Sequence, residues 1–243
     1  LRRQRQMCIR DRGKHEPVSL EGIYTDVYLL EQPSASRYAD LSNLPSEKKS
    51  KRLDGLELVR QLDTQILVIL GKPGAGKTTF LKHIALQAAA GQLDDRVPIF
   101  VALREWADDD DLLDILTEPF TACDLADPRA YVEHLLQTGR ALLLFDALDE
   151  MSEQARSAFI KTLERFSRRH LNCHILLTCR TAATPYQFER AKTVEVADFT
   201  DEQMRAFADE TAASAGVVDI LMNNAGVGLG ASFLDTTLED WDW

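Results

Sequence analysis

The chain carries Gly71-Lys72-Pro73-Gly74-Ala75-Gly76-Lys77-Thr78-Thr79 directly after the apolar run Ile66-Leu67-Val68-Ile69-Leu70. The nine residues fit the pattern G-x-x-x-x-G-K-[ST], and residues 80–86 continue as a helix-forming segment. Glycine lets such a loop curl until successive N–H groups point at an anion, and the positive end of the following helix adds to the attraction. A strand, this loop and a helix in that order predict a phosphate-binding loop rather than an ordinary glycine-rich turn.

The loop predicts the ligand as well as the fold. We expect all of its residues to contribute to a nucleotide site: Gly71, Lys72, Pro73, Gly74, Ala75, Gly76, Lys77, Thr78 and Thr79. Lys77 can reach the β- and γ-phosphates, and the Thr78 hydroxyl can ligate Mg²⁺. The expected ligands are therefore ATP or ADP with Mg²⁺; the absence of an Asn-Lys-x-Asp guanine-reading sequence favours ATP over GTP without deciding between them.

Length and charge narrow the possible functions. The 243 residues have room for one good-sized α/β domain, and the net charge of −11 offers no basic surplus to neutralise phosphates. We therefore expect neither nucleic acid nor an anionic membrane as a partner. The sequence has no run of 18 apolar residues and no CxxC pair, which predicts a soluble, cytoplasmic protein. The acidic run 108–111 is expected to be a solvated loop.

Residues 2–12 resemble the translation of a transposon sequencing adapter, codon by codon when the segment is back-translated. The competing interpretation is a basic arm that binds nucleic acid. A chance match over eleven residues is the weaker explanation, so we expect residues 1–12 to be a non-native tail. Residues 13–64 would then lead into the central domain, which we expect to span residues 65–212.

The C-terminal part resembles a short-chain dehydrogenase, through Val218-Asp219-Ile220-Leu221-Met222-Asn223-Asn224-Ala225-Gly226 and the segment 233–242. In that family the Asn-Asn-Ala-Gly segment ends a strand of a Rossmann sheet beside the nicotinamide cofactor. The family's glycine-rich dinucleotide loop is missing upstream, and its Ser…Tyr-x-x-x-Lys set would lie beyond Trp243. We expect residues 213–243 to be a chimeric fragment; the alternative is a strand and turn native to the central domain.

Between these ends, strands and helices alternate, as in a parallel sheet with helices on both faces. Short apolar runs predict strands at residues 65–70, 97–103, 141–145, 174–178 and 193–196. Helices are expected at residues 80–90 with Gly91 as the stop, from Asp127-Pro128 to Gly139, and from Thr200 through Ala208. The predicted class is α/β: a three-layer P-loop NTPase with a mainly parallel five-stranded sheet flanked by helices.

A second motif ends the strand at residues 141–145. Asp146 follows that apolar run, and the Walker-B arrangement delivers such an aspartate to the carboxyl edge of the sheet, where it can hold Mg²⁺. Two acids follow closely: either Asp149 or Glu150 could position and deprotonate the water that attacks the γ-phosphorus. We favour Glu150 as the base and leave Asp149 as the alternative.

A third motif is Ile175-Leu176-Leu177-Thr178-Cys179-Arg180, a buried strand with a polar tip. Arg180 can sense the γ-phosphate and stabilise charge that develops in the transition state. The alternative for this residue by itself is an ordinary surface arginine in a salt bridge. Its position after the other two motifs favours the sensor.

Together the three motifs resemble the NACHT family of signal-transduction ATPases. The specific marks are Asp146-Ala147-Leu148-Asp149-Glu150 and Thr178-Cys179-Arg180, and residues 199–203 fit the usual exit from the core. The resemblance covers about residues 16–210. It implies an ATP/ADP-dependent switch, an adenine contact at Ile23-Tyr24, and a homo-oligomer formed through the NTPase domain of the full-length parent. The helical and winged-helix domains that follow the core in that family have no counterpart here, which leaves exchange, oligomerisation and switching open.

Three functions remain in competition. The first is a Mg²⁺-dependent ATPase core, and the second is a nucleotide-holding scaffold with negligible turnover that uses the same residues. The third, an NAD(P)-dependent dehydrogenase, makes the opposing prediction that the intact chain binds NAD(H).

Overall fold

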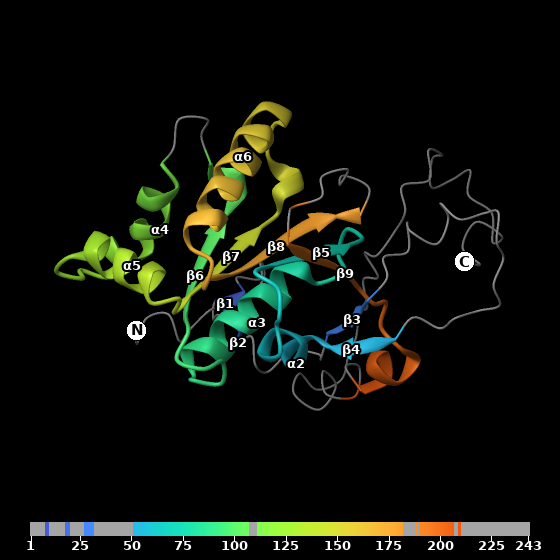
Figure 1. Ribbon diagram of the computed structural model, residues 1–243. Coiled ribbons are helices and arrows are strands. Elements are labelled where there is room, and N and C mark those ends of the chain that lie inside the picture. Colours follow the sequence, from blue (N-terminus) through green and yellow to red (C-terminus); the bar gives the residue numbers. More distant parts are fainter. Residues whose placement is uncertain are drawn as a thin grey trace.

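The computed structural model describes residues 8–9, 18–19, 27–31, 51–106, 111–181, 188, 190–206 and 209 (Figure 1). The predicted adenine contact at Ile23-Tyr24, most of the acidic run 108–111 and the dehydrogenase-like segment 213–243 lie outside these residues. Asp111, the last residue of that run, is described: its carboxylate accepts a hydrogen bond from the Leu113 N–H at 2.8 Å and caps a helix.

One sheet of seven strands organises the molecule, in the order β4-β3-β9-β5-β8-β7-β6. Five strands run parallel: β5 (Ile66–Gly71), β6 (Val97–Ala102), β7 (Ala141–Asp146), β8 (His174–Arg180) and β9 (Ala191–Val196). Two more, β3 (Tyr28–Leu30) and β4 (Arg52–Asp54), add antiparallel pairs at the β9 edge. The predicted parallel core is confirmed, but the number of strands was wrong, because three-residue strands are too short to produce a recognisable apolar pattern.

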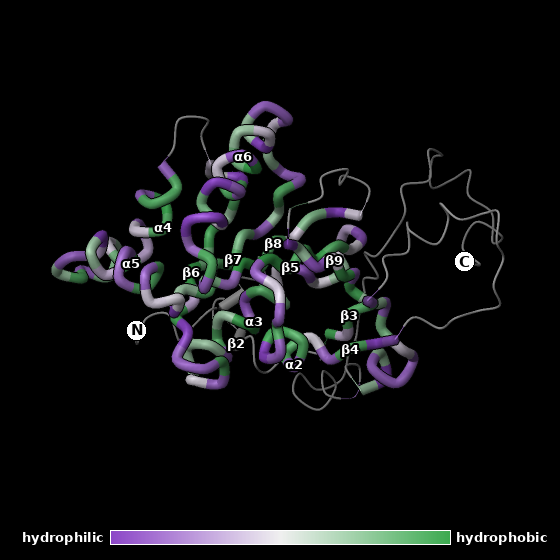
Figure 2. Tube along the Cα trace, viewed as in Figure 1, coloured by the Kyte–Doolittle hydropathy of each residue, from purple (hydrophilic) through white to green (hydrophobic). Residues whose placement is uncertain are grey.

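The parallel strands are apolar because both faces of the sheet are covered. Every residue of β5 and β7 is buried, and side chains alternate between two hydrophobic clusters. In β5, Leu67 and Ile69 join one cluster, whereas Ile66 and Val68 join the other. Burial of each such side chain contributes about 1.5–3 kcal/mol, so the central strands supply much of the fold's stability. Figure 2 shows the hydrophobic residues concentrated along these strands.

Helices form the outer layers. On one face lie α2 (Gly55–Arg60) and α3 (Lys77–Ala89); on the other lie α4 (Leu112–Thr121), α5 (Pro128–Gln137) and α6 (Glu153–Arg169) (Figure 1). The helix predicted to start at Asp127-Pro128 is confirmed, since the Asp127 carboxylate accepts the Ala130 N–H at 3.1 Å. The three-layer arrangement is therefore confirmed, although α4 and α6 were not identified from the sequence.

The shorter elements add local detail. Residues 201–206 are helical and begin with the predicted capping box, in which Thr200 and Gln203 exchange side-chain-to-backbone hydrogen bonds of 3.2 and 3.0 Å. Near the N-terminus, β1 (Cys8–Ile9) and β2 (Val18–Ser19) pair antiparallel. Within the described part of the chain, no helix combines the length and the apolar character that crossing a bilayer requires.

Strand order and register determine where the motifs meet. After β5 the chain crosses to the distant edge strand β6, and it later returns to place β8 and β9 on either side of β5. The carboxyl end of β5 is therefore a topological switch point, and α/β sheets bind ligands at such points, beyond the carboxyl ends of their strands. The register pairs Gly71 with Arg180 and Phe145 with Leu177. The next residues along β7 and β8, Asp146 and Thr178, are thereby neighbours.

The two glycines predicted to end helices permit a matched stability test. Gly91 and Gly139 both have positive φ, 78° and 69°, but an added Cβ would meet nothing within 4 Å at Gly91 and would lie 2.6 Å from the Asn172 Cβ at Gly139. Gly91→Ala should lower the free energy of unfolding by about 1–2 kcal/mol through backbone strain alone. Gly139→Ala should cost about 1–3 kcal/mol more because it also overpacks. Urea denaturation measures both, and equal losses would contradict the packing at Asn172.

Candidate phosphate-binding site

The loop between β5 and α3 has the conformation that the sequence predicts. Gly74 and Gly76 adopt positive φ values of 78° and 82°, and an added Cβ at either would meet nothing within 4 Å. Glycine is needed there for its backbone freedom rather than for space. Gly76 is also the N-cap of α3, and no side chain caps that helix. The first N–H groups of α3 are therefore left to bind an anion at the loop.

Lys77 folds back across the loop. Its Nζ donates to the carbonyl oxygens of Gly71 and Lys72, both at 2.9 Å. Burial lowers the pKa of Lys77, and the nearby Asp149 carboxylate opposes that shift. The ammonium is thus held at the base of the loop, where a phosphate would meet it.

The Lys72 side chain points elsewhere. Its Nζ lies 2.9 Å from an Asp198 carboxylate oxygen in an exposed ion pair, and this hydrogen bond raises the pKa of Lys72. Lys72 therefore contributes to the loop through its backbone, whereas its ammonium anchors the outside of the loop to the segment after β9.

Asp146 is fixed by two hydroxyl groups. Thr78 Oγ1 donates to Asp146 Oδ2 at 2.8 Å, and Thr178 Oγ1 donates to Asp146 Oδ1 at 2.7 Å. Asp146 is only 8% exposed, so these bonds offset much of the cost of burying its carboxylate. Three elements, α3, β7 and β8, are joined at this one side chain.

Thr178 has a second role in the turn that follows β7. Its Oγ1 accepts a hydrogen bond from the Ala147 N–H at 2.8 Å. Ala147 has φ of 63° and ψ of 58°, a left-handed conformation that costs a non-glycine residue about 1–2 kcal/mol. The turn brings η3 (Leu148–Glu150) back over the sheet edge, and Thr178 stabilises it there. The sequence interpretation placed Thr178 at the polar tip of the third motif but assigned the sensing role to Arg180 alone.

The two acids of η3 have different surroundings. Asp149 Oδ1 accepts the Arg180 backbone N–H at 2.9 Å, and its Oδ2 lies 2.8 Å from Arg180 Nε. The Asp149 side chain is 7% exposed and that of Arg180 is 51% exposed. Glu150, in contrast, is exposed to the solvent. The structure therefore separates two residues that the sequence left as alternatives.

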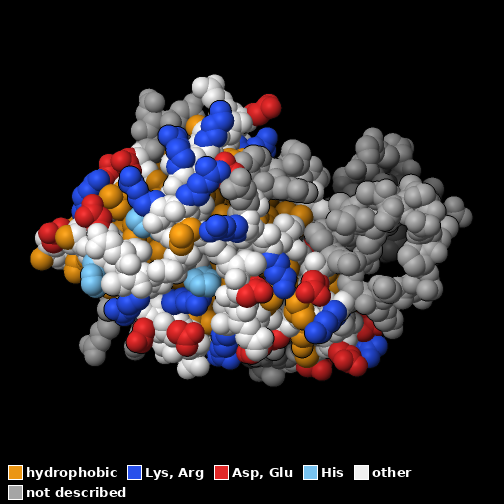
Figure 3. All heavy atoms as spheres, in the orientation of Figure 1, with side chains coloured by type: hydrophobic (Ala, Val, Ile, Leu, Met, Phe, Trp, Pro, Cys, Tyr) orange, Lys and Arg blue, Asp and Glu red, His pale blue; other side chains and the backbone are white. Residues whose placement is uncertain are grey.

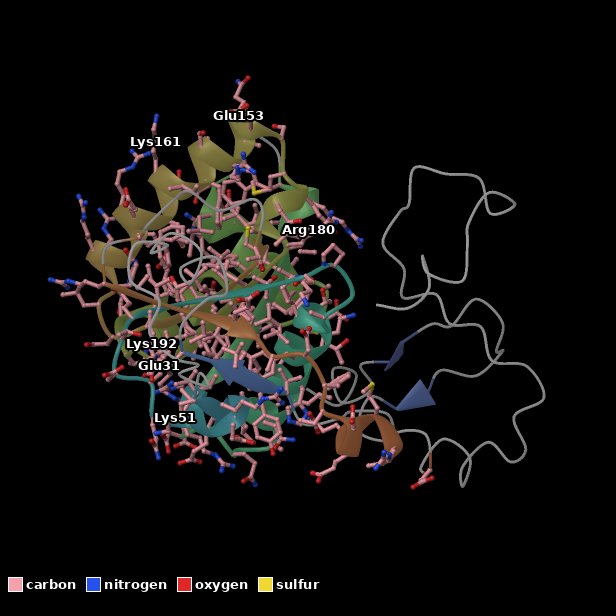
Figure 4. All side chains as sticks on the ribbon, turned by 90° about the vertical axis from the view of Figure 1, so that its right-hand side faces the viewer. Glu31, Lys51, Glu153, Lys161, Arg180 and Lys192 are labelled. Carbon is pink, nitrogen blue, oxygen red and sulfur yellow. The ribbon has the colours of Figure 1, made fainter. Side chains whose placement is uncertain are left out.

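Most of the predicted site residues line one pocket of about 320 Å³. Those that line it are Pro73, Gly74, Gly76, Lys77, Thr78, Thr79, Asp146, Asp149, Glu150 and Arg180, together with Ala147 and Thr178. Gly71, Lys72 and Ala75 belong to the same loop but do not line the pocket. In Figure 4 the Arg180 side chain projects at the opposite end of the sheet from Lys192 and Glu31, which lie 3.5 Å apart.

A larger hollow of about 870 Å³ lies between α4, α5 and α6 and contains none of the predicted site residues. Its lining includes Arg129, Arg165 and Arg169, and Figure 3 shows Lys and Arg side chains gathered over α6. By volume alone, this hollow would be the preferred candidate for the ligand site. The three sequence motifs converge on the smaller pocket, which is the better candidate for phosphate chemistry.

The sheet, the loop and the pocket define a P-loop NTPase fold with a nucleotide site at the carboxyl edge of the sheet. The NACHT domain family model matches residues 65–215. The chain therefore belongs to the NACHT domain family of nucleotide-binding P-loop NTPases, and the resemblance read from the three motifs is confirmed.

Other similarities are partial. The probable oxidoreductase EphD of Mycobacterium tuberculosis and of Mycobacterium bovis is 48% identical over 48 residues, which is 19% of this chain and 8% of the relatives' length. This chain thus spans only a small part of those proteins.

Among solved structures, a HORMA:CdnC:Trip13 complex from E. coli MS115-1 matches at 17% identity and a TM-score of 0.44, over 83% of this chain and 79% of that one. A STAND protein with a tetratricopeptide repeat sensor from Pyrococcus horikoshii matches at 16% identity and a TM-score of 0.39, over 65% of this chain and 25% of that one. AMPPCP-bound DnaA from Aquifex aeolicus matches at 16% identity and a TM-score of 0.39, over 70% of this chain and 50% of that one. These likenesses are weak, and the family assignment depends on residues 65–215.

The double role of Thr178 predicts a large stability effect from a small change. Thr178→Val keeps the shape but leaves the half-buried Ala147 N–H without its acceptor and Asp146 without one donor. We expect a loss of about 1–3 kcal/mol in the free energy of unfolding, measured by urea denaturation. Thr178→Ser is the matched control, because it keeps the hydroxyl and should lose much less; similar losses for both would show that packing, not hydrogen bonding, explains the site.

Proposed function

We propose that this chain binds and hydrolyses ATP with Mg²⁺ as the nucleotide-controlled switch of a NACHT protein. The observation that carries the proposal is the 2.8 Å hydrogen bond between Thr78 of the loop and Asp146 at the end of β7. The two residues expected to share a metal are already in contact, in a pocket that also contains Lys77.

The oxygen donors present fit Mg²⁺. Hydroxyl and carboxylate oxygens are hard ligands, and Mg²⁺ is commonly held by one or two such protein groups together with phosphate oxygens and waters. The Thr78 hydroxyl donates its hydrogen bond to Asp146, and the lone pairs on Oγ1 remain able to coordinate a metal. When bound, Mg²⁺ would neutralise charge on the β- and γ-phosphates.

The loop supplies the attraction for the phosphates. Two backbone carbonyls hold the Lys77 ammonium in this structure, and both are weaker partners than a phosphate. In the presence of a β-phosphate in the loop, the Lys77 ammonium would donate to phosphate oxygens instead of these carbonyls. The phosphate would also accept hydrogen bonds from the uncapped N–H groups at the start of α3. Lys77 thus orients and neutralises the triphosphate.

Glu150 is the best candidate for the general base. It lines the pocket and is exposed, so its carboxylate can take a proton from an attacking water. Asp149 is less suited, since Arg180 occupies both of its oxygens. Arg180 would in turn stabilise charge at the γ-phosphate.

Assembly through the NTPase domain, a cytoplasmic location and the absence of nucleic acid as a partner belong to the same proposal and rest on the family and on the acidic composition.

The phosphate grip is tested by Lys77→Ala. Loss of a charge-assisted contact should raise the dissociation constant of Mg·ATP about 10- to 100-fold, measured by titration with a fluorescent ATP derivative. Lys82→Ala on the same helix is the matched control, because Lys82 does not line the pocket, and it should bind as the parent does. Retained affinity in a folded Lys77→Ala protein would refute the loop as the nucleotide site.

The base is tested by Glu150→Gln. Single-turnover hydrolysis of bound ATP should fall about 10²- to 10⁴-fold while binding persists. Glu153→Gln, at the start of α6 and outside the pocket, removes the same charge and should leave the rate unchanged. Equal rates for the parent and Glu150→Gln would remove Glu150 from the mechanism, and a parent rate at the uncatalysed level would support the scaffold without turnover.

A further inference from the structure

Arg180 has a partner in this structure that competes with its expected one. Two donors of Arg180 converge on the Asp149 carboxylate, the backbone N–H at 2.9 Å and Nε at 2.8 Å. The Asp149 side chain is 7% exposed and the Arg180 side chain is 51% exposed. Asp149 is therefore the fixed member of the pair and the guanidinium is the member with room to move.

The pair lies where it can distinguish nucleotides. Arg180 ends β8 beside Gly71, the first residue of the phosphate loop, and both Asp149 and Arg180 line the same pocket as Lys77. Lys77 experiences both charges, Asp149 favouring its protonated form and Arg180 opposing it. An added γ-phosphate would thus enter the field of this ion pair.

The two contacts of Asp149 differ in what a ligand can disturb. The hydrogen bond from the Arg180 backbone N–H to Asp149 joins η3 to the end of β8, and it does not depend on the rotamer of the Arg180 side chain. The contact from Nε can be exchanged for another anion. The guanidinium can therefore leave while the turn remains in place.

We propose that Asp149 determines the preference of the site between nucleoside diphosphate and triphosphate by holding Arg180 away from the γ-phosphate. With a diphosphate, Arg180 stays paired with Asp149. A triphosphate has to take the guanidinium from the carboxylate and then lies close to an acid that has lost its counter-charge. Asp149 thus favours the diphosphate form; this rests on the proposed function, in which Arg180 contacts the γ-phosphate.

The test compares the binding of two nucleotides to the full chain. Mant-ADP and a mant derivative of a non-hydrolysable ATP analogue are titrated in Mg²⁺ buffer, and the ratio of the ATP-analogue dissociation constant to that of ADP is determined. Asp149→Asn keeps an oxygen for the Arg180 backbone N–H but removes the charge, so the ratio should fall about five-fold. Asp149→Ser removes the charge with a smaller side chain and should shift the ratio in the same direction.

Two controls separate this pair from a general charge effect. Asp198→Asn breaks the Asp198–Lys72 ion pair outside the pocket and should leave the ratio unchanged. In an Arg180→Gln background, Asp149→Asn should lower the ratio less than it does in the parent, because the route through the arginine is gone and only the direct repulsion between Asp149 and the γ-phosphate remains.

An unchanged ratio in Asp149→Asn and Asp149→Ser, or the same fall in the Arg180→Gln background, overturns the role of Asp149 and leaves nucleotide binding standing. If the folded parent binds neither nucleotide, the proposed function falls as well. Far-UV circular dichroism of each variant identifies a folded protein.

Discussion

The Asp146 carboxylate, held between two threonine hydroxyls, is the contact on which the rest of the site depends. One hydroxyl comes from the first turn of α3 and the other from the end of β8. An ionised carboxylate buried to this extent is tolerated only with strong hydrogen bonds, so its neighbours are constrained as much as it is. The start of α3, the end of β7 and the end of β8 are thereby fixed relative to one another.

This contact requires the hydrophobic core to set the register. Parallel pairing of β7 with β8 places Phe145 beside Leu177, and a slip of one residue between the two strands would turn Asp146 and Thr178 to opposite faces of the sheet. The apolar residues on both faces of these strands make such a slip costly. Packing that is remote from the pocket thus positions its polar atoms, which explains why continuous apolar runs precede each motif.

Much of this was predictable from the sequence, and the rest was not for physical reasons. The five core strands and the loop are marked by buried apolar runs and by glycines that require positive φ. The helix α4 contains Pro119, a residue that normally indicates a helix boundary, and β3 and β4 are too short for a pattern. The division between Asp149 and Glu150 depends on a long-range contact with Arg180, to which local sequence gives no access.

Sequence reasoning included Thr178 in the third motif but did not predict its contact with Asp146, which side-chain alternation could have indicated. Leu176 belongs to the cluster that packs against α3, so Thr178 and Arg180, two and four residues later, face that same side of the sheet. Leu142 and Leu144 place Asp146 there by the same rule. The end of β8 therefore carries both the Thr178 hydroxyl, which orients the expected metal ligand Asp146, and Arg180, which pairs with Asp149. Both project from one strand, which stays paired with β5 as far as Arg180, so the same element positions Asp146 and the guanidinium beside Asp149.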